Sequence, residues 1–148
     1  MKIEDNSPIN FIENIFHYLS PFSAYQVEVD DYIYPTLEHA YQSLRVKPGP
    51  EREEIKNSRS PMDAWRIGQT YKNNPDLRVP NQDKAELMEM LMRAKLKQHD
   101  DIKALLIESG DRGLLKVYPT DYFWATGADG SGENIMGKIW MKLRDELK

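Results

Sequence analysis

The stretch DKAELMEMLMRAKLKQ, residues 83–98, carries the clearest periodic pattern in the chain. Its apolar residues recur at spacings of three and four, which places them on one face of a helix. That face is formed by Leu87, Met88, Leu91 and Met92, and Lys95 falls on it as well. The segment therefore predicts a long helix, and most of the other patterned segments share its period.

Several shorter segments also have helical spacing and recognisable end signals. They are PTLEHAYQSLRV (35–46), EREEIKN (51–57), SPMDAWRIGQTY (60–71), a stretch from Asp100 or Asp101 to Gly110, and the C-terminal stretch from Asn134. QVEVDDYIY (26–34) alternates instead, which predicts a β-hairpin turning at Asp30-Asp31. LLKVY (114–118) predicts a short strand. The result is a helix-rich α+β fold with a small antiparallel sheet, and Trp65 and Trp140 are expected in its core.

Length and composition limit the class of protein. The 148 residues fit one domain, 1–148, with residues 1–10 expected to be a loosely held tail. The absence of cysteine excludes disulfides and thiolate metal sites, and the three histidines lack zinc-ligand spacing, so neither a metal nor a cofactor is expected.

No apolar run reaches the roughly 20 residues of a membrane span, and the N-terminus lacks a signal-peptide layout, which predicts a cytoplasmic protein with no membrane partner. A net charge of −4 argues against a general nucleic-acid binder but allows an enzyme that acts on one nucleotide.

Three polar residues form a stripe beside the apolar face of the helix at 35–46. Glu38, Gln42 and Arg45 share the spacing of that face, displaced by one position. A carboxylate in the first turn of a helix is held ionised by the helix dipole, so Glu38 could stabilise a positive charge that develops on a sugar, or orient a water. Arg45 could bind phosphate. The alternative is that Glu38 serves helix stability alone and that Arg45 is solvated.

Two other features carry candidate chemistry. Lys95 lies on an apolar face, where desolvation would favour reactivity, although long lysines often extend out of such faces. DYFWATGADGSGEN (121–134) places Asp121, Trp124 and three glycines, Gly127, Gly130 and Gly132, ahead of Asn134 at a helix N-terminus. Free N–H groups there could bind an anion, or the stretch could be a flexible loop followed by a helix cap. Trp124 could stack on a ring or pack in the core.

Four stretches together resemble the NADAR family (also called YbiA-like). PTLEHAYQ is similar to the family's P-T-x-E-H-x-x-Q stretch and SPMDAWRIG to its S-P-x-x-A-x-x-x-G stretch. LMRAKLKQH matches its A-K-F/L helix, and DYFWATGADGSGENIMGKIWMKLRDEL its aromatic-Trp, glycine, Asn and terminal Arg signature. The likeness runs in order from about Phe16 to Leu147.

The resemblance implies hydrolysis of an N-glycosidic bond to ribose. Members of the family are associated with cleaving early riboflavin-pathway intermediates and with removing ADP-ribose from guanine, which would need single-stranded or flipped-out DNA. The matching positions imply Glu38, Asp121 and Lys95 as catalytic candidates. Trp124 would stack on a base or sugar, and the glycine loop with Asn134 would hold phosphate or ribose hydroxyls. We expect Glu38 and Trp124 to face one cleft.

This chain also departs from the family pattern. Many relatives have a lysine where this chain has Arg45, and a guanidinium cannot form a Schiff base with an opened ribose. Pro80 stands where many relatives place a tryptophan, and Ala125-Thr126 interrupts the usual W-G-x-G. These changes imply either a different substrate or a non-hydrolysing module that binds ADP-ribose or a related nucleotide.

Overall fold

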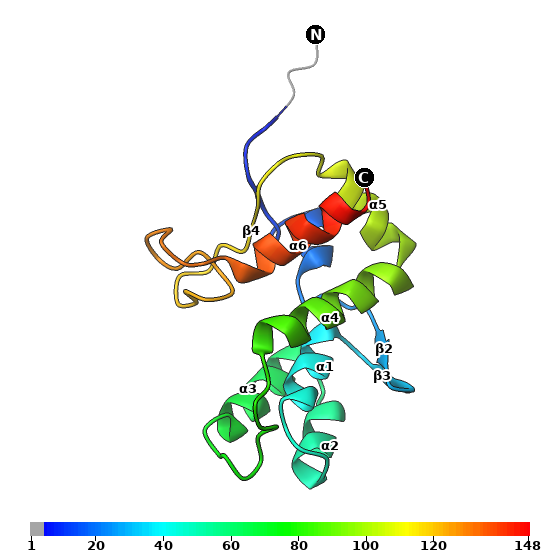
Figure 1. Ribbon diagram of the computed structural model, residues 1–148, viewed down its shortest axis with the longest axis vertical. Coiled ribbons are helices and arrows are strands. Elements are labelled where there is room, and N and C mark those ends of the chain that lie inside the picture. Colours follow the sequence, from blue (N-terminus) through cyan, green and yellow to red (C-terminus); the bar gives the residue numbers. More distant parts are fainter. Residues whose placement is uncertain (1–4) are drawn as a thin grey trace. The chain divides into compact units, whose positions relative to one another are not determined.

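The computed structural model describes residues 5–148, and Figure 1 gives its element labels. The chain forms two compact units. The central unit is Pro21–Gln98, and the terminal unit takes in the chain up to Ser20 together with His99–Lys148. The helix-rich α+β class is confirmed, whereas the expectation of a single domain stays a prediction. Among the described residues, no helix is long and apolar enough to cross a membrane.

The central unit is built around one short helix. Its elements are β2 (Val27–Val29), β3 (Tyr32–Tyr34), α1 (Leu37–Leu44), α2 (Pro50–Lys56), α3 (Pro61–Tyr71) and α4 (Lys84–Gln98). α1 contacts α2, α3, α4 and both strands. As a result its residues 37–43 are all buried. Glu38 and Gln42 of the predicted polar stripe are therefore buried, whereas Arg45, at the end of the helix, is only partly buried.

The predicted hairpin is present as β2 and β3. The two strands are antiparallel, with Val27 opposite Tyr34 and Val29 opposite Tyr32. Asp30 and Asp31 both have positive φ, 51° and 64°, as a two-residue turn matched to the strand twist requires. The side chain of Gln98 continues the pairing at the edge of β2, accepting from Glu28 N at 2.8 Å and donating to Glu28 O at 2.9 Å.

His39 fixes the start of α1. Thr36 Oγ1 accepts from His39 N–H at 3.2 Å as the helix cap, and lies 2.8 Å from His39 Nδ1. His39 Nε2 lies 3.1 Å from the carbonyl oxygen of Ser58. Because a carbonyl only accepts, Nε2 carries the hydrogen, and in the neutral ring Nδ1 accepts from the Thr36 hydroxyl. The ring thus joins α1 to the loop before α3 in its neutral form.

We expect the central unit to lose stability in mild acid because of His39. Burial lowers the pKa of His39 below its usual 6.5, while the bond to Ser58 acts in the opposite direction. As the pH falls, His39 is therefore protonated in the unfolded chain before it is protonated in the folded protein, which favours unfolding. The contribution of His39 is complete above pH 6.5 and is lost between 6.5 and the lower folded-state pKa. Denaturant unfolding at pH 8 and pH 5.5 measures this. The free energy of unfolding should depend less on pH in His39→Asn than in the wild type. His17→Asn, which replaces an exposed histidine, should leave that dependence unchanged. The same pH dependence in both variants would exclude His39 as the cause.

The terminal unit joins the two ends of the described chain. Its elements are β1 (Ile9–Asn10), the short 3₁₀-helix η1 (Ile15–Leu19), α5 (Asp100–Glu108), β4 (Leu114–Leu115) and α6 (Ile135–Glu146). β1 and β4 are parallel, with Ile9 opposite Leu114. Ile9 and Asn10, expected in a loose tail, therefore form a strand, because β4 supplies its partner from far along the chain. Residues 1–4 of that tail lie outside the described residues.

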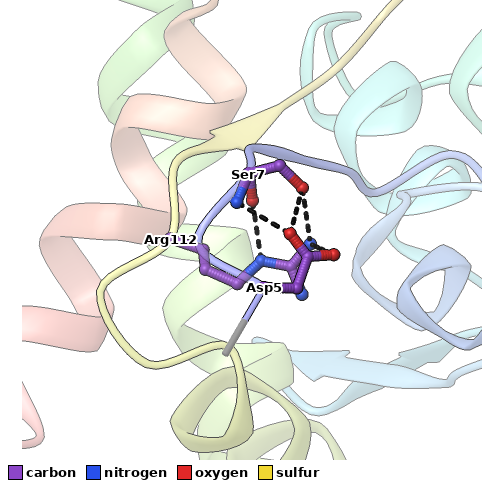
Figure 2. A network of polar contacts seen from close by, with 3 residues as sticks. All are labelled: Asp5, Ser7 and Arg112. Carbon is purple, nitrogen blue, oxygen red and sulfur yellow. Dashed lines mark hydrogen bonds and ion pairs between the residues drawn. The ribbon is translucent and has the colours of Figure 1, made fainter. Parts of the chain in front are cut away.

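The segment before β1 is also tied to the turn after α5 (Figure 2). Arg112 Nε donates to Ser7 O at 2.7 Å, and Arg112 Nη2 lies 3.4 Å from Asp5 Oδ2. Asp5 Oδ1 accepts from Ser7 N at 2.9 Å. Hydrogen bonds from Ser7 lower the pKa of the Asp5 carboxyl. Asp5 and Ser7 are exposed and Arg112 is partly buried, so the network orders the segment without forming part of the core.

The two tryptophans expected in the core differ. Trp140 on α6 is fully buried and donates from Nε1 to the Leu19 carbonyl at 3.0 Å. Trp65 on α3 is 42% exposed, so the prediction for this residue was wrong. α3 turns Ala64 and Gly68 inward instead, and these small residues allow it to approach α1 closely.

Candidate functional site

Glu38 is buried at the start of α1. The residue is only 5% exposed, and its backbone N–H donates to the Pro21 carbonyl oxygen at 3.1 Å. One turn later, Gln42 Nε2 donates to Glu38 Oε1 at 2.8 Å. The N-terminal end of a helix favours a negative charge in its first turn. A carboxylate out of contact with bulk water and held by an amide is suited to act on a positive charge developing next to it.

Lys95 is a second buried group of the central unit. It is 0% exposed on α4, so its long side chain stays inside. Its Nζ donates to Ser23 Oγ at 2.7 Å and lies 5.3 Å from the ring centroid of Tyr25. A buried amine is costly unless its hydrogens have partners, and Ser23, itself buried, supplies one. Ser23 and Tyr25 were not among the predicted residues, because a loop before a hairpin carries no periodic signal.

Arg45 ends α1 and contacts a tyrosine of the same helix. Its Nη1 donates to Tyr41 Oη at 3.0 Å, and its guanidinium lies 5.6 Å from the centroid of that ring. Burial raises the pKa of Tyr41 to about 12, although the adjacent guanidinium acts in the opposite direction. Tyr41 therefore stays neutral at physiological pH.

In the terminal unit, the carboxylate of Asp121 caps a turn. Asp121 Oδ1 accepts from Phe123 N at 3.1 Å and from Trp124 N at 2.9 Å, while Oδ2 lies 3.5 Å from Lys116 Nζ. Trp124 is half-buried. Its ring packs edge-on against the ring of Phe123, with the two ring centroids 4.7 Å apart. The contacts of Asp121 are those of a residue that holds the backbone near Trp124 in place. Its catalytic role stays a prediction.

Two of the three glycines in the loop meet a steric requirement of the fold. Gly127 has φ 71° and lies under the ring of Tyr122, where a Cβ would be 2.2 Å from Cε1. A Cβ on Gly132 would lie 2.3 Å from the Ala125 carbonyl oxygen. Gly130 also has positive φ, at 79°, but nothing is near it. The loop is therefore closely folded on itself at Gly127 and Gly132, and binding of a ligand by its glycines stays a prediction.

The N-terminus of α6 is already hydrogen-bonded within this loop. The N–H groups of Asn134, Ile135 and Met136 donate to the carbonyls of Ala125, Phe123 and Trp124 at 3.0, 3.0 and 3.3 Å. These are the groups that the sequence suggested were free for an anion, so that expectation was wrong for them. The loop satisfies them because its backbone runs beside the first turn of the helix.

Asn134 holds the loop to β4. Its Oδ1 accepts from Lys116 N at 2.9 Å, and its Nδ2 donates to the Leu114 carbonyl at 3.0 Å. Its backbone is left-handed, with φ 51°, and its side chain does not cap α6. Contact of Asn134 with a substrate stays a prediction, because both ends of its amide serve the fold.

The predicted site residues thus fall into two groups. Glu38, Gln42, Arg45 and Lys95 belong to the central unit, where Glu38 and Gln42 contact each other. Asp121, Trp124, Asn134 and the glycines belong to the terminal unit. The cleft expected between Glu38 and Trp124 involves both units and stays a prediction. Among residues 5–148, no cluster of three or more histidine, aspartate or glutamate side chains is suited to hold a metal ion.

Comparisons with known proteins cover nearly the whole chain. The pattern of the NADAR domain matches residues 9–148. The N-glycosidase YbiA of Escherichia coli (strain K12) is 33% identical over 141 residues, which is 94% of this chain and 88% of that protein. The chloroplastic riboflavin biosynthesis protein PYRR of Zea mays is 30% identical over 148 residues, 90% of this chain but 24% of that protein. The NMR structure of E. coli YbiA matches with a TM-score of 0.83 at 31% identity, covering 98% of this chain and 87% of that one.

Proposed function

This chain belongs to the NADAR family, and from that premise we propose that it is an N-glycoside hydrolase. Its substrate would be a phosphate-bearing nucleotide in which ribose is linked to a base. The observation that carries the proposal is the buried carboxylate of Glu38, held by Gln42, in a chain one-third identical to a protein named an N-glycosidase.

In the proposed reaction, the bond between the ribose anomeric carbon and the base nitrogen breaks. Its electron pair leaves with the base, and the sugar acquires oxocarbenium character. Glu38 stabilises that positive charge from its buried position and orients the water that adds to the anomeric carbon. One proton of the water goes to the departing base and the hydroxyl stays on the ribose, so the reaction needs no further reactant.

A covalent route through the ring-opened ribose would depend on Lys95. Of the two basic residues predicted at the site, only Lys95 has an amine that can form an imine, because the guanidinium of Arg45 cannot. Burial of Lys95 against Ser23 supports a role for the amine other than surface charge. In this route the Lys95 amine bonds to the anomeric carbon, and the base leaves with the electron pair of the glycosidic bond and one amine proton. The ring oxygen takes the second amine proton as its bond to the anomeric carbon opens, which leaves an imine. Water then hydrolyses the imine, which releases the sugar and restores the amine.

Two substrate classes agree with the family. One relative is named a riboflavin biosynthesis protein, which favours an early intermediate of that pathway. The other class is ADP-ribose attached to guanine, in single-stranded or flipped-out DNA. A net charge of −4 favours a free nucleotide or a short contact with a modified base over extended binding along DNA.

We expect purified protein to release base or ADP-ribose from one of these substrate classes, measured by chromatography with mass detection. Each substrate is incubated separately with the protein, and a sample reduced with borohydride is examined for a protein–sugar adduct. An adduct that is absent in Lys95→Met supports the covalent route. Failure to cleave either class would contradict the hydrolase proposal for these substrates.

A non-hydrolysing binding module is the second candidate, and the pairing of Arg45 with Tyr41 favours it. Where many relatives have an amine, this chain has a guanidinium that already bonds to a phenol of its own helix. Such a pair binds phosphate without reacting with sugar. Calorimetry that shows tight binding of ADP-ribose, with the ligand recovered intact after incubation with either substrate class, would favour this candidate over the hydrolase.

A further inference from the structure

α3 has a glycine in its interior that the helix itself does not need. Gly68 lies well inside Pro61–Tyr71 and is buried. Glycine destabilises a helix interior relative to alanine. The backbone of Gly68 is helical, a conformation that alanine adopts readily, and Gly68 is absent from the residues with positive φ. Space, rather than backbone conformation, therefore accounts for the glycine.

The space is filled by a single side chain. A Cβ placed on Gly68 would lie 2.0 Å from Gln42 Oε1, 2.7 Å from Gln42 Cδ and 3.2 Å from Gln42 Cγ. These are the three nearest atoms, and no backbone of a neighbouring helix is among them. The amide of Gln42 thus rests directly against the α3 backbone at the point where a side chain is missing.

The other end of the same amide is bonded to the candidate catalytic acid. While Oε1 of Gln42 lies against Gly68, its Nε2 donates to Glu38 Oε1 at 2.8 Å. Gln42 is buried, so the orientation of its amide is set by the groups that it contacts. Contact with α3 on one side therefore sets where the N–H is directed on the other.

We propose that Gly68 is a positioning residue, which acts through Gln42 to fix the carboxylate of Glu38. This proposal rests on the proposed role of Glu38 in hydrolysis. It explains why α3 retains a residue unfavourable to helices at a buried position facing α1, with which α3 is in contact.

A methyl group at position 68 would act mainly on Gln42 rather than on the fold. The clash involves the end of a flexible side chain, and that end moves at less cost than two packed helices do. Movement of the amide relieves the contact but breaks its bond to Glu38. Because alanine also strengthens α3, the loss of packing is offset and the protein is expected to stay folded.

The test uses Gly68→Ala, Gln42→Ala and the double variant. Thr70→Ala is the control, because it also raises the helix preference of α3, but at an exposed site. Melting temperature reports the fold, and the side-chain amide resonances of Gln42 report its position. kcat, KM and the pH profile are measured with whichever substrate the wild type cleaves.

We expect Gly68→Ala to shift the Gln42 amide resonances and to keep the melting temperature near that of the wild type. It should lower kcat about tenfold with little change in KM. The acidic limb of its pH profile should move to higher pH, as in Gln42→Ala.

The double variant decides the pathway. If Gly68 acts through Gln42, the double variant has the kcat of Gln42→Ala alone, because the added methyl group no longer meets the Gln42 amide. Losses that multiply, or unchanged Gln42 resonances in Gly68→Ala, would overturn the proposal. A wild-type protein that cleaves nothing would contradict the proposed function, whereas the amide resonances would still decide whether Gly68 positions Gln42.

Discussion

Glu38→Gln is expected to lower kcat/KM by about 10²–10⁴-fold, the range associated with a positioned acid or base. The substitution keeps the size of the side chain, and the new amide oxygen can still accept from Gln42 Nε2. It removes only the charge, which is the property that the transition state requires. KM should change little, because the ground-state nucleotide carries no positive charge at the anomeric carbon.

The matched control is Glu86→Gln, which removes an exposed acid from the first turn of α4. It tests the general effect of losing a helix-dipole partner, which is a fraction of a kcal/mol in stability, about 0.3–1. Base release is followed for both variants, with melting temperatures to establish folding. Wild-type kcat/KM in folded Glu38→Gln would remove Glu38 from the mechanism.

Trp140→Ala is expected to lower the free energy of unfolding by about 3–5 kcal/mol, as for other fully buried aromatics. The substitution leaves a cavity at α6 and deprives the Leu19 carbonyl of its donor at 3.0 Å. A loss of this size is a large part of the total stability of a small protein, so the variant should unfold at a markedly lower denaturant concentration than the wild type.

Trp65→Ala is the control, because it removes the same side chain from a position 42% exposed. Its expected cost is below about 1 kcal/mol. Denaturant unfolding followed by circular dichroism compares the two. A Trp140 variant no less stable than the Trp65 variant would mean that α6 does not depend on this residue for its packing.

Local patterns predicted the helices and the hairpin well, because their signals lie within a few residues of one another. Thr36 caps α1 and Ser60 caps α3, each through its hydroxyl oxygen, and each of these residues stands directly before a helical pattern in the sequence. A strand was predicted at 114–118, where β4 lies, but β1 and its pairing with β4 could not be found in this way. The two strands are each two residues long, and neither carries an alternating pattern of its own.

The candidate site was predicted in part. Spacing placed Glu38 and Gln42 on one stripe, and their hydrogen bond follows from that spacing. Spacing could not show that Glu38 and Gln42 are buried. Their burial depends on α2, α3, α4 and the hairpin, all of which contact α1. Nor could it identify the partner of Lys95, Ser23, which lies 72 positions away along the chain.

For the loop before α6, local sequence indicated a binding feature that the folded backbone does not offer. Its glycines and its helix N-terminus resembled an anion cradle, but the carbonyls of Phe123 and Trp124 occupy two of the N–H groups. Whether such groups are free depends on the path of the preceding backbone. Composition alone does not determine that path.

The parallel pairing of β1 with β4 has a consequence for biosynthesis. Arg112 and Ser7, which flank the pair, are 105 positions apart, so nascent β1 leaves the ribosome long before its partner strand has been translated. The central segment is complete by Gln98 and has all of its own helices by then. Since chains fold progressively as they are made, Ile9 and Asn10 have no partner strand until β4 has been translated. We would look there for chaperone contacts during translation.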